Sequence, residues 1–291
     1  MVRLIKKNDY WYLQYSYKVD KSQKTFEKYL GKEVPKNILR LREEFMEEVF
    51  RERFQKTLDT IQINFIKEYN SYTISIKEKF LSQFAIKFTY NSQAIEGSTL
   101  SLKDTALLIE QGITPQKKFE DVELSKTHYD TFLEILKENK DITTGLIIEW
   151  HKRLFSKTYP DIAGKFRNHP VRVMGSKAQF SHYSKIESEL KEFIKWYNYN
   201  KNIIHPFRLA ALSHLKFVSI HPFTDGNGRV SRLLMNYILY QNNFPLIDIE
   251  YNKRKSYYNS LEKDQVNETY YHFVDYLAKK FIKDYQEYNF E

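Results

Sequence analysis

Cysteine is absent from the 291-residue chain, which excludes disulfides, zinc–thiolate sites and cysteine nucleophiles and fits an intracellular compartment. Proline and glycine number only 7 and 8, so the sequence predicts mostly helix with few loops. No apolar run approaches the ~20 residues of a membrane span. The N-terminal stretch MVRLIKKNDYWY has no apolar segment typical of a secretory signal. We therefore expect a cytoplasmic protein with no membrane partner.

The abundant residues are apolar, aromatic and basic. Apolar residues make up 42% of the chain, with 23 tyrosines and 21 phenylalanines, enough to bury a core. The formal net charge is +9, and residues 1–40 carry +6 of it, from ten Lys or Arg against four Asp or Glu. Such a basic segment can bind an acidic partner or nucleic acid. A solvated hairpin is the simpler explanation.

The first 37 residues predict a small β-hairpin module. Large or apolar side chains fall on every second position from Trp11 to Val19, the period of a strand with one buried face. A turn at 20–24 and a second strand at 25–31 complete the hairpin. The segment EVPKN at 33–37 ends the pattern.

From residue 38 onward the spacing of apolar residues is that of helices. Ser101 and Asp104 form a capping-box signature at the start of one helix, and Gly112 is placed to end it. After a helical stretch from about 38 to 94 and the helix that Ser101 begins, further helices are predicted at 120–138, 142–155, 185–198, 205–219, 227–242 and about 267–285.

Residues 164–180 interrupt this helical pattern. The alternation in VRVM, followed by GS, predicts an embedded β-hairpin. We therefore expect a mainly α fold with N-terminal helices at 38–112 and a second helical domain at 113–291.

One stretch, HPFTDGNGRVSR at residues 221–232, concentrates residues that can do chemistry. It follows a predicted helix, and Pro222 turns the chain before a second helix begins near Asn227. The first turn of a helix presents unpaired backbone N–H groups at the positive end of the helix dipole, which makes it an anion site. Gly226 and Gly228 carry no Cβ and let these donors approach a phosphate closely.

Charged side chains complete this anion site. Arg229 and Arg232 lie three residues apart and share one helix face. A cation at a helix N-terminus is disfavoured by ~0.3–1 kcal/mol, so the pair makes sense when a polyanion is bound. Asp225 is placed to share Mg²⁺ with a nucleotide. His221, with an unperturbed pKa of ~6.5, suits a general base for a hydroxyl nucleophile.

Other interpretations of this stretch fail on spacing. Arg229 stands where an EF-hand loop needs an oxygen ligand. The glycines lack the spacing and the lysine of a Walker A loop, and the H-E-x-x-H spacing of a metal hydrolase is absent. The remaining conspicuous histidines are interpreted as structural, with the first of them at a helix start: His205, His214 and His151.

The stretch resembles the defining loop of Fic-domain proteins, H-x-F-x-[DE]-G-N-G-R-x-x-R, at every fixed position. The similarity extends to the preceding helix RLAALSHLKFVSI, the flap hairpin GKFRNHPVRVMGS and the following helix LLMNYILYQNNFPLI, and covers roughly residues 75–285. It implies a Fic-type helical bundle. It also implies transfer of AMP from ATP, with Mg²⁺, to a Ser, Thr or Tyr hydroxyl of a protein target, the chain itself included.

The resemblance implies a role for each residue of the site. His221 is the base, and Asp225 carries Mg²⁺. Arg229 and Arg232 hold the β- and γ-phosphates. The other expected nucleotide contacts are Gly226, Asn227, Gly228, Val230 and Ser231 in the loop, Val173, Met174, Gly175 and Ser176 along the flap, and Tyr257 and Tyr258 near the adenine.

Two positions refine the expected chemistry. The kinase-like branch of the family has lysine where Gly228 stands, so glycine here favours AMP transfer. Some relatives have an asparagine near the adenine where this chain has Gln265, which leaves that contact open.

A second motif, SQAIEG, resembles the inhibitory sequence [ST]-x-x-x-E-[GN] of the family, with Ser92, Glu96 and Gly97 in register. On its own, such a motif is merely a helix end. In a Fic-like chain it implies an inhibitory helix at about residues 79–97. The Glu96 carboxylate would pair with Arg232 and compete with ATP. The same carboxylate can orient water for removal of AMP.

Three functions stay open on the sequence. The chain is an auto-inhibited protein AMPylase, with or without the reverse activity, or a nucleotide-sensing module with vestigial catalysis. The third alternative is a nucleic-acid-associated regulator that uses the basic hairpin. A homodimer is compatible with each of them.

Overall fold

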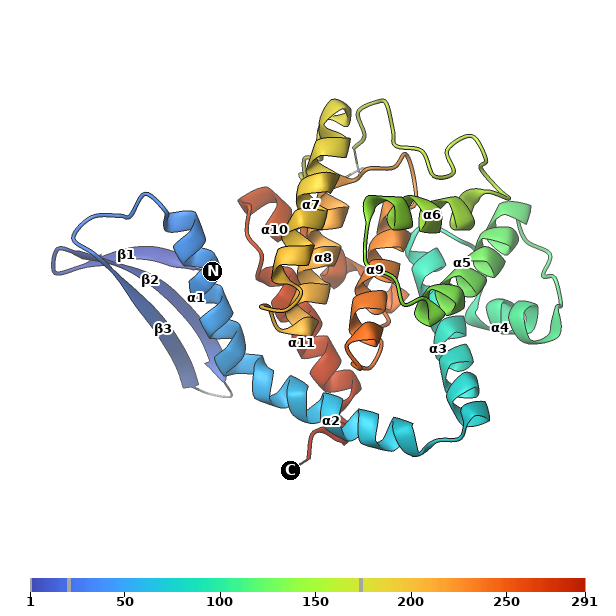
Figure 1. The fold of residues 1–291 in the computed structure, drawn as a ribbon, viewed down its shortest axis with the longest axis horizontal. Helices are drawn as coiled ribbons and strands as arrows, with labels where there is room; N and C mark the ends of the chain where they lie inside the picture. The colour runs from blue at the N-terminus through green and yellow to red at the C-terminus, as the bar shows by residue number, and fades with distance from the viewer. Residues whose placement is uncertain (1, 20–21, 173–174, 291) are drawn as a thin grey trace. The chain divides into compact units, whose positions relative to one another are not determined.

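The computed structural model describes residues 2–19, 22–172 and 175–290 and divides into two compact units, Met1–Thr60 and Ile61–Glu291. Figure 1 shows the first unit as three strands with a helix and the second as a set of helices. The mainly α fold expected from the periodicity is confirmed. No described helix combines the length and apolarity needed to cross a bilayer.

The sheet of the first unit is an antiparallel meander of β1 (Arg3–Lys7), β2 (Tyr10–Val19) and β3 (Ser22–Gly31), in that order. The sequence pattern predicted only two strands. β1 was missed because its five residues, RLIKK, include three cations and show no clear alternation.

α1 (Ile38–Phe50) packs in the same unit as the sheet. Phe45 of α1 and Leu13 of β2 are buried, and Lys28 Nζ of β3 lies 2.7 Å from Glu48 Oε1 of α1. The sequence pattern groups this helix with those that follow, because an amphipathic stripe shows that a helix is buried but not against which partner. A π-helical turn, η1 (Arg51–Gln55), joins α1 to α2 (Lys56–Ser71).

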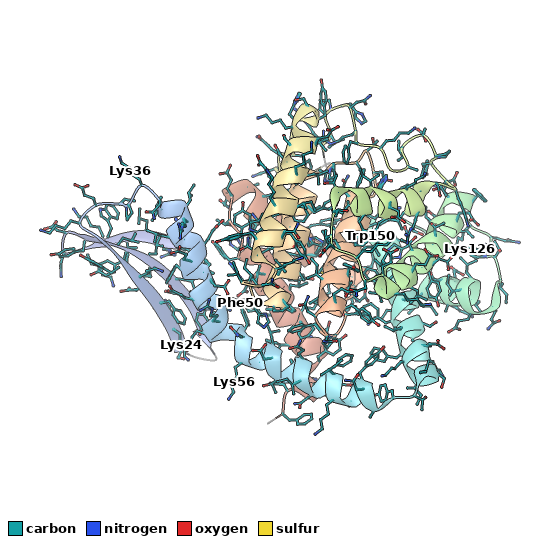
Figure 2. All side chains as sticks on the ribbon, viewed as in Figure 1. Lys24, Lys36, Phe50, Lys56, Lys126 and Trp150 are labelled. Carbon is teal, nitrogen blue, oxygen red and sulfur yellow. The ribbon has the colours of Figure 1, made fainter. Side chains whose placement is uncertain are left out.

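The second unit is built around two adjacent helices whose residues are almost all buried, α8 and α9. They pack along each other, with α7 and α11 against α8 and with α3 and α5 against α9 (Figure 1). Trp150 of α6 is fully buried in this unit (Figure 2). The helices are α3 (Ile74–Ile95), α4 (Leu102–Gln111), α5 (Phe119–Lys137), α6 (Thr144–Phe155), α7 (Ile186–Asn200), α8 (Pro206–Ile220), α9 (Asn227–Gln241), α10 (Arg254–Asn267) and α11 (His272–Asp284).

The predicted capping box at the start of α4 is present. Ser101 Oγ accepts a hydrogen bond from the Asp104 N–H, and the Asp104 carboxylate accepts one from the Ser101 N–H. The helix ends at Gly112, whose φ of +67° lies in the left-handed region. The capping box and the glycine therefore allowed both ends of this helix to be predicted from the sequence.

Two segments differ from their sequence-based expectation. α10 was not predicted, because RKSYYNSLEKDQVN contains only two aliphatic residues and no apolar stripe. Among the described residues of 164–180 there is no strand. The segment forms one isolated bridge, from Phe166 to Phe223.

α3 is tied to the loop that follows α9. Asn91 Nδ2 donates to Asp248 Oδ2 (2.6 Å), and the Tyr251 N–H donates to Asn91 Oδ1 (2.9 Å). Asp248 is buried, and its Oδ1 has no hydrogen-bond partner among the described residues. Burial raises the pKa of Asp248 to about 7, although Lys87 and Asn91 act in the opposite direction.

We predict that Asp248→Asn stabilises the protein more at pH 8 than at pH 5. The folded carboxyl, with a pKa of about 7, keeps its proton in a pH range where the unfolded carboxyl, with a pKa of ~3.9, has lost it. Stability therefore falls as the pH rises from ~4 to 7. Asparagine carries no charge and its Oδ1 can still accept from Asn91. The free energy of unfolding, measured with urea, should gain roughly 2–4 kcal/mol more from this substitution at pH 8 than at pH 5.

Asp161→Asn, on an exposed turn, is the matched control and should leave the free energy of unfolding unchanged at both pH values. An Asp248→Asn effect of the same size at both pH values would contradict the raised pKa.

Candidate active site

The loop between α8 and α9 borders a cavity of about 690 Å³. Segments from four parts of the second unit meet there. Val173 and Met174, which were expected on the flap, lie outside the described residues. The expected residues that line the cavity are His221, Asp225, Gly226, Asn227, Gly228 and Arg232, with Gly175 and Ser176 of the flap, Tyr257 and Tyr258 of α10, and Glu96 at the end of α3.

Other expected residues lie behind this lining. Val230 is fully buried, and the Ser231 hydroxyl donates to Gly228 O (2.8 Å) within α9. Gly97, with φ of +100°, ends α3 directly after Glu96. The expected residues that do not line the cavity are Ser92, Gly97, Arg229, Val230 and Ser231.

Arg229 is buried beside the loop and orients its carboxylate. Its Nη2 lies 2.8 Å from Asp225 Oδ2, its Nη1 donates to Gln93 Oε1 (3.3 Å), and its guanidinium lies over the Phe155 ring. Burial acts to raise the pKa of Asp225, but Arg229 and the Gly226 N–H outweigh it, so the pKa lies below its usual value. The Asp225 carboxylate is therefore ionised at neutral pH.

The loop is held in one conformation by its own asparagine and by packing. The Phe223 N–H donates to Asn227 Oδ1 (2.9 Å), and Asn227 Nδ2 donates back to Phe223 O (2.8 Å). The Phe223 ring stacks on His151, with 3.8 Å between ring centroids. Gly226 adopts φ of +80°, and a Cβ there would overlap the Phe155 ring. Sterics alone therefore require glycine at position 226, before any ligand is considered.

His221 ends α8 in a left-handed conformation, with φ of +53°, which is strained for a residue other than glycine. Its Nδ1 lies 3.2 Å from Val218 O. Because a carbonyl oxygen can only accept, Nδ1 carries the proton and Nε2 keeps its lone pair. Burial lowers the pKa of His221, and the Arg167 guanidinium lowers it further, against the opposite effects of Val218 O and nearby carboxylates. The imidazole is therefore neutral at pH 7 and able to accept a proton at Nε2.

Arg167 is a positioning residue that sequence reasoning missed. Its buried guanidinium donates to four carbonyl oxygens, those of His221 (2.7 Å), His169 (2.9 Å), Ser181 (2.5 Å) and Ile220 (3.5 Å). It thereby fixes both ends of the flap, residues 164–182, to the histidine loop. Its only sequence signal is a single arginine in GKFRNH, which has no periodicity that could reveal it.

Glu262 of α10 holds the flap from the other side. Its Oε1 accepts from Ser176 Oγ (3.0 Å) and from the Lys177 N–H (2.6 Å). Gln265, one turn further along α10, lines the cavity and donates from Nε2 to Ser219 Oγ (3.2 Å). Because α10 was not predicted from the sequence, the contact of Glu262 with the flap was not predicted either.

Arg232 carries a buried charge next to the cavity. Its Nε donates to Ser92 Oγ (3.0 Å), and its Nη2 donates to Ser92 O (3.0 Å) and to Glu96 Oε1 (2.8 Å). Its Nη1 has no hydrogen-bond partner among the described residues. Burial acts to lower the pKa of Arg232, but the Glu96 carboxylate outweighs it and keeps the guanidinium charged.

The Glu96 carboxylate reaches the first turn of α9. A Cβ on Gly228 would overlap Glu96 Oε1 and would lie 3.0 Å from Arg232 Nη1. Glu96 therefore stands where the unpaired N–H groups and the dipole of α9 favour an anion. A side chain of the protein fills the position suited to a phosphate.

Three other histidines, which the sequence pattern favours as structural, lie outside the lining of the cavity. His205 is the N-terminal cap of α8. His214 is buried, and its Nε2 lies 3.0 Å from the Tyr257 hydroxyl oxygen. Burial lowers the pKa of His214. His151 is stacked against Phe223, and burial lowers its pKa to about 4.

Comparison with known proteins decides the family. A profile of the Fic/DOC family matches residues 141–239. The solved structure of Fic-1 from Caenorhabditis elegans is 30% identical in sequence, with a TM-score of 0.69 over 87% of this chain and 76% of that chain. The chain belongs to the Fic family.

Two further Fic relatives agree with this assignment. A solved Fic-domain-containing signaling protein from Bacteroides thetaiotaomicron is 27% identical, with a TM-score of 0.70 over 79% of this chain and 96% of that chain. Protein adenylyltransferase fic-1 from C. elegans is 33% identical over 208 residues, which is 69% of this chain and 40% of that protein. The chain spans less than half the length of the curated relatives it matches.

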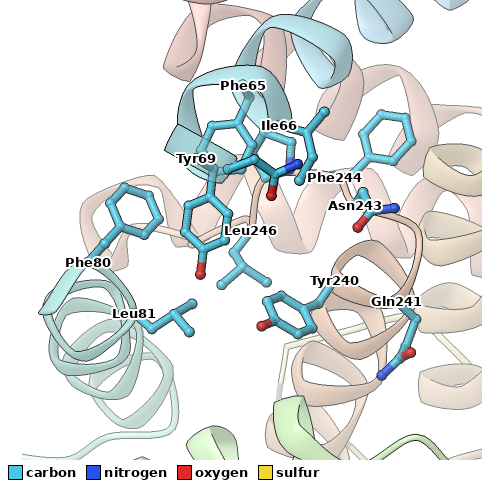
Figure 3. Close-up of a pocket in the computed structure, with 12 residues that line it drawn as sticks. Phe65, Ile66, Tyr69, Phe80, Leu81, Tyr240, Gln241, Asn243, Phe244 and Leu246 are labelled. Carbon is cyan, nitrogen blue, oxygen red and sulfur yellow. The ribbon is translucent and has the colours of Figure 1, made fainter. Parts of the chain in front are cut away.

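A second cavity of this Fic protein, about 260 Å³, lies between α2, α3 and the segment after α9 (Figure 3). Its lining is mostly aromatic and aliphatic, with Phe65, Tyr69 and Phe80 on one side and Tyr240 and Phe244 on another. No lysine, arginine, histidine or carboxylate among the described residues lines it. Because no charged group there could pair with a phosphate, the cavity at the Fic loop is the candidate active site.

We predict that Gly226→Ala strongly destabilises the Fic loop. Alanine at a left-handed φ costs ~1–2 kcal/mol on its own, and here its Cβ would also overlap Phe155. Gly112→Ala is the matched control, since its φ is +67° but no atom lies within 4 Å of the added Cβ. Urea unfolding should show a loss at least ~2 kcal/mol larger for Gly226→Ala, in the range of overpacked cores. Equal losses would show that Phe155 gives way without cost.

Proposed function

We propose that this Fic-family chain transfers AMP from ATP to a hydroxyl side chain of a protein target. The observation that carries the proposal is an unprotonated His221 Nε2 in the same cavity as the anion position at the start of α9. The cavity, about 690 Å³, has the size of a small-molecule site. Relatives named protein adenylyltransferase support the same activity.

The cavity offers complementary groups to ATP. Backbone N–H groups in the first turn of α9, beside Gly226 and Gly228, are donors for phosphate oxygens. Arg232 Nη1, buried and without a partner among the described residues, is a donor for the terminal phosphate once Glu96 moves. Tyr258, which is 42% exposed, offers aromatic surface to the adenine, and the buried Tyr257 ring packs beside it with 5.2 Å between centroids. The assignment of each phosphate to a particular arginine stays part of the proposal.

Asp225 fits the role of a Mg²⁺ ligand. Its side chain is half exposed to the cavity and ionised. A Mg²⁺ ion that binds with a nucleotide takes only one or two carboxylates, together with phosphates and waters. Among the described residues no cluster of three His, Cys, Asp or Glu forms a dedicated metal site. Bound there, Mg²⁺ would neutralise phosphate charge.

His221 supplies the proton transfer. Its Nε2 takes the proton of the target hydroxyl as that oxygen attacks the α-phosphorus of ATP. The bond from the α-phosphorus to the bridging oxygen breaks, and pyrophosphate leaves. The described part of the flap, held by Arg167 and Glu262, lies beside His221 and would align the segment that carries the hydroxyl.

Glu96 would act as a brake on this reaction. It occupies the anion position at α9 and pairs with Arg232, so the terminal phosphate of ATP must replace it. If ATP binds with Glu96 in place, its phosphates are displaced from the line of attack. The same carboxylate is placed to orient water toward a modified side chain and so to support removal of AMP.

We predict that His221→Ala abolishes AMP transfer and largely preserves ATP binding. Loss of a general base lowers a rate by ~10²–10⁴, while the anion position at α9 does not involve the imidazole. Transfer is measured with ATP labelled in the α-phosphate and a mixture of cell proteins, and binding by calorimetry. Transfer at the wild-type rate would overturn the assignment of the base. ATP binding without label on any protein, in the wild-type chain, would instead identify a nucleotide sensor.

We predict that Glu96→Gly raises labelling of the chain itself and of its targets by at least ~10-fold. The substitution removes the anion that competes for Arg232 and leaves space for a phosphate. The double variant Glu96→Gly/His221→Ala should be inactive again, because the brake and the base are separate groups. If Glu96→Gly leaves labelling unchanged while the protein stays folded, the SQAIEG motif is only a helix end. A selective loss of AMP removal would assign Glu96 to the reverse reaction.

A further inference from the structure

The sheet of the first unit has one covered face and one open face. Leu13 and Tyr15 of β2 are buried on the covered face, where α1 packs. Side chains alternate along a strand, so the intervening residues of β2 and their cross-strand partners lie on the opposite face. The residues of this open face that matter here are Arg3, Lys7, Tyr10, Tyr12, Lys18 and Tyr29.

We propose that this open face binds single-stranded nucleic acid, with bases stacked on its tyrosines and phosphates paired with its basic side chains. Such a site is independent of the proposed transfer reaction.

A cluster of three tyrosines forms the centre of the face. Tyr29 lies next to Tyr10 and Tyr12, with ring centroids 5.7 and 5.5 Å away. Its side chain is 57% exposed. On the covered face, by contrast, the aromatic residues are packed by protein: Tyr17 stacks on Phe26 and lies under the Arg53 guanidinium. Exposed rings on a sheet are stacking surfaces for unpaired bases.

Positive charge borders these rings. Lys7 Nζ lies 5.8 Å from the centre of the Tyr12 ring, and Lys32 Nζ lies 6.0 Å from the centre of the Tyr10 ring. Glu27 is the only carboxylate on the open face among the described strand residues. Lys7 and Gln14 both bind it, at 2.6 and 2.7 Å, and Lys7 lowers its pKa.

The net charge of the face therefore stays positive, from Arg3, Lys18 and Lys32. This charge is complementary to a phosphate backbone. An acidic protein would match the charge but would leave the ring faces without partners. A strand with unpaired bases matches both, since every base has a π-face.

Apart from Ile5, which lies opposite Tyr12, the remaining side chains of the face are uncharged and can donate and accept hydrogen bonds. Ser16 and Thr25 lie opposite each other across β2 and β3, with 2.9 Å between their hydroxyl oxygens. Gln14 lies two residues before Ser16 on β2. Polar groups of this kind can hydrogen-bond to the edges of different bases, so we expect the site to show only a weak preference for one nucleotide sequence.

The test uses the full chain and fluorescence anisotropy with labelled twelve-nucleotide strands of dT and of U. We expect Tyr29→Ala to weaken binding by about 5- to 100-fold, the effect of losing one stacked base. Tyr29→Phe keeps the ring and should retain binding. Tyr199→Ala, which removes a tyrosine that is 74% exposed on α7, is the matched control and should bind as the wild type does.

Charge is tested by salt dependence. Lys32→Gln should weaken binding and reduce the slope of log K against log salt by ~0.7, the value for one phosphate contact on a single strand. Lys24→Gln, at a position on the covered side of the sheet, should leave the slope unchanged. His221→Ala should bind the strands normally, so a failed transfer reaction and a failed nucleic-acid site give different results.

Three results would overturn the proposal. The first is no binding of either strand at 50 mM salt. The second is equal affinity for heparin, with no loss in Tyr29→Ala, because the face would then be a general polyanion or acidic-protein surface. The third is a preference for a duplex of the same length, which would replace stacking by groove binding. Circular dichroism of each variant confirms that the sheet is intact.

Discussion

A buried guanidinium needs an anion beside it, and the site depends on how this chain meets that need. Arg232 is only 1% exposed and lies in the second turn of α9, where the helix dipole does not favour a cation. Ser92 and Glu96 satisfy it from α3. The pairing also brings the Glu96 carboxylate against the first turn of α9, where a Cβ on Gly228 would overlap it. The same buried charge is why we propose a phosphate as the anion that replaces the carboxylate there.

His221, the proposed base, and Glu96, the proposed brake, are separate groups. His221 is already neutral, with Nε2 available, while Glu96 occupies the anion position. Under the proposed function, regulation would therefore act on the position of the phosphates, and hence on the alignment of the α-phosphorus with the attacking oxygen, and not on the protonation of the base. Arg167 and Glu262 complete the separation, because they fix the flap through contacts that do not involve Glu96.

The sequence predicted what local chemistry encodes. The histidine loop, the capping box at Ser101 and the left-handed end at Gly112 each show as unusual residues at short spacing, and the mainly α class follows from periodicity. Arg167, Glu262 and β1 were missed because their roles come from contacts with distant residues, which leave no local pattern. The packing of α1 in the unit of the sheet could not be predicted for a related reason. Its apolar stripe specifies burial, whereas the partner is chosen by the tertiary fold.

Glu96 is the last residue before the turn that ends α3, and its side chain is 24% exposed. The helix behind it is fastened by Asn91 to Asp248 and Tyr251. In the proposed function the Glu96 carboxylate would therefore leave Arg232 by rotation about its side-chain bonds, without displacement of α3. Side-chain rotations near a surface take picoseconds to nanoseconds, whereas helix displacement takes microseconds or longer. On this proposal the resting and competent forms would share one backbone and would interconvert rapidly. Activity should accordingly follow ATP occupancy in a graded way, without the lag or hysteresis of a slow structural transition.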